Sequence, residues 1–329
     1  MIKRLLCALL SVLLLFSFAS CGKARDDGKF TIVCTLFPQY DWLKNVTRDA
    51  ENVEVVLLIS NGTDPHSYQP TAADIMTISN CDMIVYTGAD SDQWVQKAID
   101  RSKNQGITKI KLTELEGIEL QNISASSHSH DHGHDEHEDH EGHSHSALDE
   151  HLYLSLHNAK AATLALADEL CKIDSSNAEL YSKNATAYAK ELDELDSAFR
   201  ADLAASDVEE PFMLFADRFP FVYLLSDYRI SYSAAFEGCS ADVDAGFDTV
   251  IRLIKEVDAH NAKFVAVTET SDKALARTVI SSTKTKNQEI ITLNAMQAVT
   301  SSQIESGTTY LSVMKDNLNA VRRAVGITN

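Results

Sequence analysis

The sequence predicts an α/β protein with two lobes, each a mostly parallel sheet flanked by helices, joined by one long rigid helix. Two observations indicate this fold. Short apolar strands alternate with amphipathic helices in two separate series, and a long stretch without Gly or Pro lies between the series. Strands separated by helices favour a parallel sheet that is covered on both faces. We therefore expect a first lobe at residues 30–173, the connecting helix at 174–206 and a second lobe at 207–329.

Each series is predicted from its apolar pattern. Apolar, β-branched runs bounded by polar or turn residues predict strands, and segments with helical spacing predict helices. In the first series, strands are expected at 30–37, 53–59 and 82–88, and helices at 42–49, 71–79 and 92–103. In the second, strands are expected at 211–216, 229–236, 263–269 and 289–293, and helices at 247–260, 272–283 and 308–325.

The connecting helix is predicted by an apolar stripe. Apolar residues recur every three or four positions between Ala178 and Ala205, and 28 residues at about 1.5 Å each would make a rod of roughly 42 Å. A stiff single-helix link predicts a small closure on ligand binding. A coiled-coil dimer is the alternative for this stripe, but we expect a monomer.

The N-terminal residues predict export. Lys3 and Arg4 precede an apolar run that is shorter than the ~20 residues a membrane-spanning helix needs, so residues 1–20 are typical of a signal peptide. Small residues followed by Cys21 resemble a bacterial lipobox. We expect cleavage before Cys21, lipidation of its thiol and a flexible lipidated leash at 21–29, which would tether the chain to the cell membrane. A plain secretory signal with an incidental Cys21 is the alternative.

Charge limits the partners. The 329 residues include 29 Lys and Arg against 48 Asp and Glu, a formal charge of −19. Removal of Lys3 and Arg4 with the signal would make it about −21. Such a field repels phosphate, so binding to nucleic acid is not expected and a cationic partner is more natural.

Four cysteines would remain beyond the signal and the lipidation position: Cys34, Cys81, Cys171 and Cys239. They allow three disulfide pairings, which the sequence does not separate, and free buried thiols are equally acceptable. Their wide spacing contains no CxxC, which argues against a thiolate zinc site.

A histidine tract occupies residues 128–145, with eight His and six Asp or Glu in 18 positions. It cannot bury enough apolar area to offset its ordering entropy, so we expect a mobile loop at 124–148. Neutral imidazole binds Zn²⁺, Cu²⁺ and Ni²⁺, which predicts a weak, multi-site metal collector. A solvated spacer is the alternative. The collecting residues are His128, His130, His132, His134, His137, His140, His143 and His145.

Two isolated histidines have a different setting. His66 lies in a turn-rich loop after the strand expected at 53–59, and loops at the carboxyl ends of parallel strands are where open α/β sheets place ligands. His151 lies where the tract gives way to an ordered segment. A lone His is by default a structural residue, so spacing alone leaves both roles open.

A resemblance sharpens this reading. FPQYDWLKNV, NGTDPHSYQPTAADI, YTGADSDQWVQKAI, the histidine loop, DEHLYLSL, DRFPFVYLLSDY, SAAFEGCSAD and TYLSVMKDNL occur in this order. Together they resemble the zinc-binding lipoproteins of ABC importers, metal-specific solute-binding proteins of the cluster A-I class. The resemblance covers nearly all of the chain beyond the signal. It implies two α/β lobes around a rigid helix, one buried metal between them, and delivery to a membrane permease driven by a cytoplasmic ATPase.

The same resemblance implies the ligands. His66 and His151 match the first two, and Glu269 resembles the fourth. The third is usually His or Glu, whereas the corresponding stretch here has no His and offers Asp217 as its nearest carboxylate. A helix N-cap is the other reading of Asp217, and Glu237 and Asp242 are reserve carboxylates.

We therefore expect an extracytoplasmic, lipid-anchored receptor for Zn²⁺, with no catalytic residues. Mn²⁺ is the nearest rival cargo, although it binds imidazole least well in the divalent series. A surface metal buffer or adhesin without a transporter is the alternative from another class. A zinc hydrolase is disfavoured because no catalytic motif or general base is found.

Overall fold

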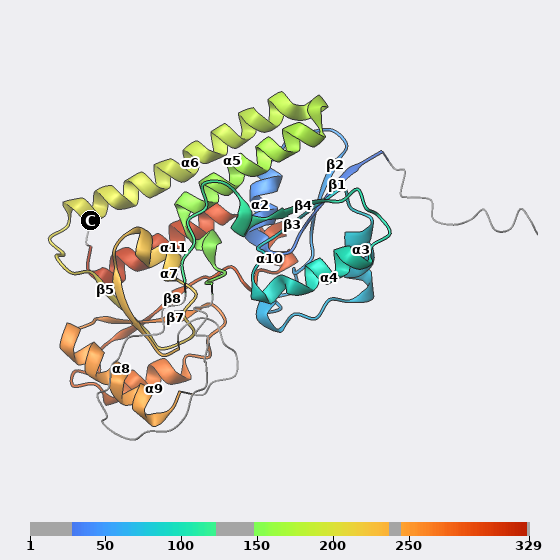
Figure 1. Ribbon diagram of the computed structural model, residues 1–329. Coiled ribbons are helices and arrows are strands. Elements are labelled where there is room, and N and C mark those ends of the chain that lie inside the picture. Colours follow the sequence, from blue (N-terminus) through green and yellow to red (C-terminus); the bar gives the residue numbers. More distant parts are fainter. Residues whose placement is uncertain (1–27, 123–147, 237–244, 328–329) are drawn as a thin grey trace, which may run out of the picture.

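The computed structural model describes residues 28–122, 148–236 and 245–327, which form two parallel four-stranded sheets (Figure 1). Helices flank both sheets, and the predicted fold class is confirmed. The signal segment, Cys21, the leash up to residue 27, the histidine tract, Glu237, Cys239 and Asp242 lie outside the described residues. In the described part, Cys34, Cys81 and Cys171 are free thiols.

The first sheet has the order β2-β1-β3-β4, with all strands parallel. Its strands are β1 Phe30–Cys34, β2 Val53–Leu57, β3 Met83–Tyr86 and β4 Thr108–Lys111, and its helices are α2 Phe37–Val46, α3 Ala72–Ser79 and α4 Gln93–Arg101. Strand β4 was not predicted from the sequence. Its TKIK sequence buries only Ile110, so this edge strand carries no apolar run.

The second sheet repeats this arrangement in the order β6-β5-β7-β8, again all parallel. Its strands are β5 Phe212–Phe215, β6 Ser231–Ala234, β7 Phe264–Thr268 and β8 Glu289–Leu293. Its helices are α7 Val222–Asp227, α8 Phe247–His260, α9 Ala274–Ser282, α10 Ser301–Glu305 and α11 Tyr310–Val325. The carboxyl ends of β5 and β7 lead directly to Asp217 and Glu269.

The long helix α6, Ala178–Ala205, runs beside α5, Leu156–Ile173, along one side of both lobes (Figure 1). Its apolar stripe is buried at Tyr181, Tyr188, Leu192 and Phe199. Because the stripe packs inside the chain, it does not require the coiled-coil partner that was the alternative. The two lobes are therefore braced by a pair of helices, α5 and α6.

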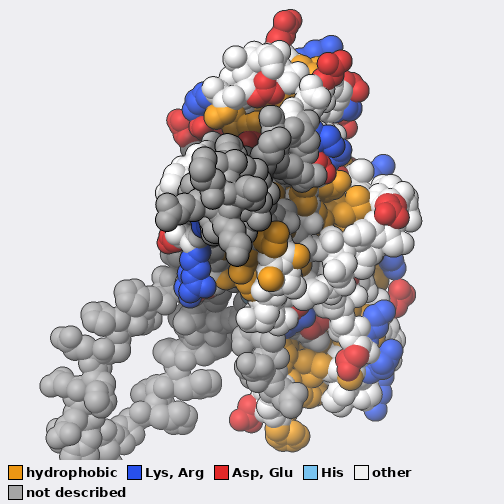
Figure 2. Space-filling model, turned by 90° about the vertical axis from the view of Figure 1, so that its right-hand side faces the viewer, with side chains coloured by type: hydrophobic (Ala, Val, Ile, Leu, Met, Phe, Trp, Pro, Cys, Tyr) orange, Lys and Arg blue, Asp and Glu red, His pale blue; other side chains and the backbone are white. Residues whose placement is uncertain are grey.

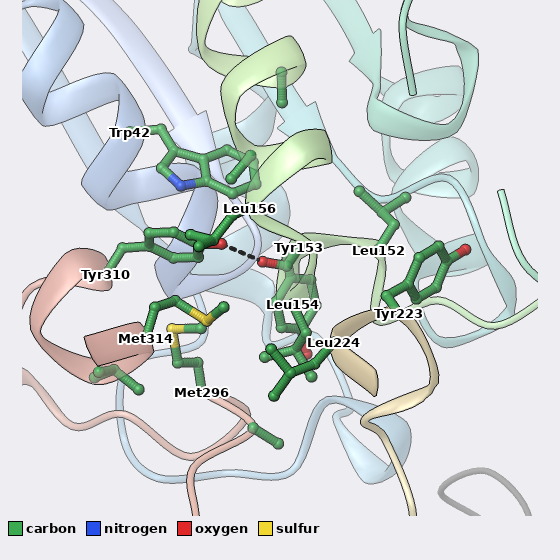
Figure 3. Packing of buried hydrophobic residues seen from close by; sticks show 14 of the residues in the cluster. Trp42, Leu152, Tyr153, Leu154, Leu156, Tyr223, Leu224, Met296, Tyr310 and Met314 are labelled. Carbon is green, nitrogen blue, oxygen red and sulfur yellow. Dashed lines mark hydrogen bonds between the residues drawn. The ribbon is translucent and has the colours of Figure 1, made fainter. Parts of the chain in front are cut away.

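A shared core joins the lobes beside α5 (Figure 3). The ring of Trp42 on α2 contacts that of Tyr310 on α11 edge to face, with centroids 5.4 Å apart. The Tyr310 hydroxyl donates to the backbone carbonyl of Tyr153 at 2.7 Å. The segment that follows His151 is thus packed against a second-lobe helix.

No helix among the described residues is long and apolar enough to span a bilayer. On the face that Figure 2 presents, Lys and Arg side chains are scattered among Asp and Glu and do not gather into one basic field.

Candidate metal centre between the lobes

His66 is held by a short turn after β2. It lies in the 3₁₀ turn Pro65–Ser67, and the Asp64 carboxylate caps that turn by accepting from the His66 backbone N–H at 3.0 Å. Pro65 fixes the first position of the turn. The His66 side chain is 19% exposed, so the ring borders a space that solvent barely enters.

His151 lies directly before the 3₁₀ turn η4, Leu152–Leu154, and its side chain is 3% exposed. Asp149 Oδ1 accepts from the His151 backbone N–H and contacts ring Nδ1, both at 2.9 Å. The alternating leucines at 152, 154 and 156 form this turn and the start of α5. Every residue from His151 to Leu156 is buried, and the His151 ring contacts Gln297 of the second lobe.

Both imidazoles have a carboxylate on Nδ1. Glu150 Oε1 lies 2.9 Å from His66 Nδ1, as Asp149 Oδ1 does from His151 Nδ1. An ionised carboxylate only accepts hydrogen bonds, so in each neutral ring the proton is on Nδ1 and Nε2 carries the lone pair. Carboxylate–histidine pairs of this kind orient metal-binding imidazoles.

Glu150 is itself anchored and kept ionised. Its other oxygen accepts from the backbone N–H of Ser91 at 3.1 Å. Burial opposes ionisation, but hydrogen bonds from His66 and from the Ser91 hydroxyl lower the pKa of Glu150 to about 2.

The side chain of Gln297 lies between the two rings. Its Nε2 is 2.8 Å from His66 Nε2 and 2.8 Å from His151 Nε2, and the ring centroids are 5.5 Å apart. Gln297 belongs to the loop between β8 and α10, so the site joins both lobes. Sequence reasoning missed it, because a search for His, Cys and carboxylates ignores a neutral amide.

The free space at the site is small. A cavity of about 10 Å³ is lined by Leu36, Pro65, His66, Thr87, Ser91, Glu150, His151, Tyr153 and Gln297. This volume suits a single ion or water molecule.

Glu269 follows β7 and supports the Gln297 loop. Its Oε2 accepts from the backbone N–H of Ala295 at 2.9 Å, and the backbone of Gln297 also donates to its carboxylate. Its Oε1 is buried and has no hydrogen-bond partner among the described residues. Burial raises the pKa of Glu269, partly offset by these backbone donors. A buried carboxylate oxygen without a donor fits a nearby cation.

Asp217 makes its hydrogen bonds within the second lobe. Oδ1 accepts from the Arg218 backbone N–H, and Oδ2 accepts from the N–H and hydroxyl of Thr268 at 2.9 and 2.8 Å. These bonds join the ends of β5 and β7. The helix that follows, α7, begins only at Val222, so Asp217 does not cap it.

The described residues contain no group of three or more His, Cys, Asp and Glu placed to hold one metal ion. What converges is two imidazole Nε2 atoms and one amide. Glu269 and Asp217 both lie in the second lobe, just after the ends of β7 and β5.

Comparisons with known proteins agree with this arrangement. Residues 32–324 match the family described as "Zinc-uptake complex component A periplasmic". Zinc-binding lipoprotein AdcA of Streptococcus pneumoniae is 30% identical over 98% of this chain and 61% of its own length, so the chain spans about three fifths of that relative. The high-affinity zinc uptake system protein ZnuA of Bacillus subtilis is 29% identical over 92% of each chain.

A solved structure is also similar. The Zn(II)-bound ZnuA-like domain of Streptococcus pneumoniae AdcA gives a TM-score of 0.70 at 26% identity, covering 91% of this chain and 99% of that domain.

Proposed function

Because the chain belongs to the family of zinc-uptake complex component A, we propose that it is an extracytoplasmic receptor that captures Zn²⁺ and delivers it to an ABC-type importer. The observation that carries this proposal is the convergence of His66 and His151 Nε2 on one point between the lobes. Each ring is oriented by its own carboxylate, which is the arrangement that a zinc-binding imidazole needs.

The proposed first ligands are His66 and His151, with Glu269 as the oxygen ligand from the second lobe. The unpartnered Oε1 of Glu269 supports that role. Asp217 is the proposed fourth ligand, and it would have to exchange its bonds with Thr268 for the metal. A set of two nitrogens and two oxygens suits tetrahedral Zn²⁺.

Mn²⁺ is the alternative cargo of the same site. Two imidazoles favour Zn²⁺ over Mn²⁺, which prefers oxygen ligands and lies lowest in the divalent affinity series. Direct competition of the two ions for the metal-free protein decides between them.

The proposal extends to location and partners. Lipidation at Cys21 would hold a monomer at the outer side of the cell membrane, where it would meet a permease with a cytoplasmic ATPase. The eight histidines between His128 and His145 would collect metal weakly. A surface buffer or adhesin would share the site but act without a permease. The small cavity leaves no room for an organic substrate beside the ion, which supports a non-enzymatic role.

Equilibrium dialysis of the chain from residue 26 tests the proposal. We expect one tight Zn²⁺ and several weak ones, and deletion of residues 128–145 should remove only the weak class. His66→Ala and His151→Ala should each abolish tight binding, because each removes a nitrogen ligand. His157→Ala is the matched control, since that ring is 51% exposed and contacts Glu119 away from the site.

Three results would contradict it: tight binding that survives both site variants, loss of the tight site with the tract, or wild-type protein without a tight site.

The oxygen ligands need their own variants. Glu269→Gln and Asp217→Asn keep shape but remove charge, so a ligand role predicts a large loss of zinc affinity in each. An Asp217 that only joins β5 to β7 would lower stability and leave zinc affinity unchanged.

A further inference from the structure

The amide of Gln297 contacts both metal-binding imidazoles through one atom. Its Nε2 lies 2.8 Å from Nε2 of His66 and 2.8 Å from Nε2 of His151. The chemistry of the rings fixes which end of the amide faces them. Carboxylates occupy both Nδ1 positions, so both Nε2 atoms accept, and only the NH₂ end of an amide supplies two hydrogens.

This arrangement imitates a bound cation. The NH₂ group carries partial positive charge and meets the two lone pairs that a metal ion would take. It therefore keeps both imidazoles in the tautomer that binds metal, because it donates one hydrogen to each Nε2 atom.

The loop that carries Gln297 is anchored independently of the histidines. Asn317 of α11 accepts from the backbone N–H of Asn294 at 2.7 Å and donates to its carbonyl at 2.8 Å. Glu269 accepts from the backbone of Ala295 and Gln297. The backbone is held from two sides, so the side chain is the part that can yield to an ion.

We propose that Gln297 sets the affinity of the site: its amide occupies the metal position in the metal-free protein, and the ion binds by displacing it. This inference rests on the proposed zinc function. Each binding event then breaks two N–H···N hydrogen bonds, and each release restores them. A receptor that must give up its cargo gains from such an internal competitor, because the emptied site is refilled from within.

The test is zinc affinity of Gln297→Leu, measured by competition with a chelator of known affinity. Leu has a similar volume and no donor, so the metal-free state loses two hydrogen bonds that the zinc-bound state does not have. We expect binding to tighten roughly tenfold, because the ion no longer has to break two hydrogen bonds and water recovers only part of their contribution. Gln105→Leu is the control, because it removes an exposed amide that donates to the Ser102 carbonyl.

Two further measurements make the test independent of one variant. Gln297→Ala should also tighten binding if Gln297→Leu does not fold. In wild-type protein, ¹⁵N NMR should find both rings as Nδ1–H tautomers with a hydrogen-bonded Gln297 amide, and zinc should abolish those amide bonds while the tautomer persists.

Unchanged or weaker zinc binding in the folded Gln297 variants would overturn the inference, and weaker binding would make Gln297 a ligand. The inference would also be overturned if the NMR signals of the Gln297 amide did not change when zinc is added. Failure of the zinc function itself looks different: wild-type protein would then lack the tight site that depends on His66 and His151.

Discussion

Arg218 of the second lobe and Asp64 of the first form an ion pair beside the His66 turn, with Nη1 2.5 Å from Oδ2. The other oxygen of Asp64 accepts from the His66 backbone, so one carboxylate ties the first histidine turn to the second lobe. Burial opposes ionisation of Asp64, but hydrogen bonds from Arg218 and from the His66 backbone lower its pKa. The two lobes therefore meet at the site through charge as well as through Gln297.

Arg218→Gln should lower the free energy of unfolding by about 1 kcal/mol, because the pair is three-quarters buried yet still reached by water. It should also weaken zinc binding, since the His66 turn loses its tie to the second lobe. Urea unfolding and zinc titration measure the two effects. Lys160→Gln, which breaks the exposed pair with Asp193, is the control and should change neither by a measurable amount. If Arg218→Gln and Lys160→Gln changed stability and zinc affinity equally, the location of the Arg218–Asp64 pair between the lobes would have no special effect.

Asp149→Asn should weaken zinc binding by roughly 10- to 100-fold, the usual effect of losing a carboxylate behind a metal-binding imidazole. Asparagine can turn its NH₂ group toward Nδ1 and so favour the wrong tautomer of His151. Glu150→Gln should act in the same way on His66. Glu119→Gln removes an exposed carboxylate near His157 and should leave affinity unchanged. Wild-type affinity in both Asp149 and Glu150 variants would refute the role assigned to these pairs.

Tyr310→Phe should lower both stability and zinc affinity. It removes the hydrogen bond to the Tyr153 carbonyl, and the loss of one such bond costs about 0.5–1.5 kcal/mol. Tyr153 is two residues from His151, so the His151 imidazole should lose its fixed position when this contact is lost. Tyr181→Phe removes a hydroxyl that donates to Asp174 at the far end of α6, so it should lower stability without changing zinc affinity. If the two variants bind zinc with the same affinity, the shared core around Tyr310 does not position the site.

Stability should depend on pH through Asp41. Burial raises its pKa to about 6, opposed by hydrogen bonds from Tyr188 and the Tyr310 backbone. The folded state therefore binds the proton more tightly than the unfolded state, whose value is about 3.9. The stabilising contribution is complete below pH ~4 and is lost as pH rises through about 6, an effect of order 3 kcal/mol.

Asp41→Asn keeps an acceptor and cannot titrate, so unfolding free energies of the variant and the wild type should diverge between pH 4 and 6.5, with the wild type losing more. Parallel curves would contradict the assigned pKa. The contribution of Glu150 to stability changes with pH in the opposite direction. Its pKa is lowered to about 2, so the contribution is present above pH ~4.5 and is lost only in strong acid.

Much of the fold follows from local pattern. The seven strands that were expected are apolar and β-branched, and all of them form, whereas β4 was missed because it is short, polar and at a sheet edge. Helix α5 was missed because its buried face mixes leucines with alanines and with the polar residues Asn158 and Thr163, which interrupt the apolar pattern. How the lobes share the core around Trp42 and Tyr310 depends on contacts between residues far apart in sequence.

Some residues of the candidate site could be predicted from the sequence and others could not. His66 and His151 were singled out by the family resemblance rather than by spacing alone, and the structure brings their rings together. Asp149 and Glu150 adjoin His151, but nothing local indicates that Glu150 serves His66. Gln297 carries no charge and lies 146 positions from His151, so its place between the rings follows only from the folded chain.

The most direct test is an anomalous-scattering map, collected at the zinc edge, from crystals of the zinc-loaded protein. The account predicts one strong peak about 2.0–2.1 Å from Nε2 of both His66 and His151, with the Gln297 amide displaced from that point. A strong peak elsewhere in the ordered chain, with Gln297 still bound to both imidazoles, would contradict it.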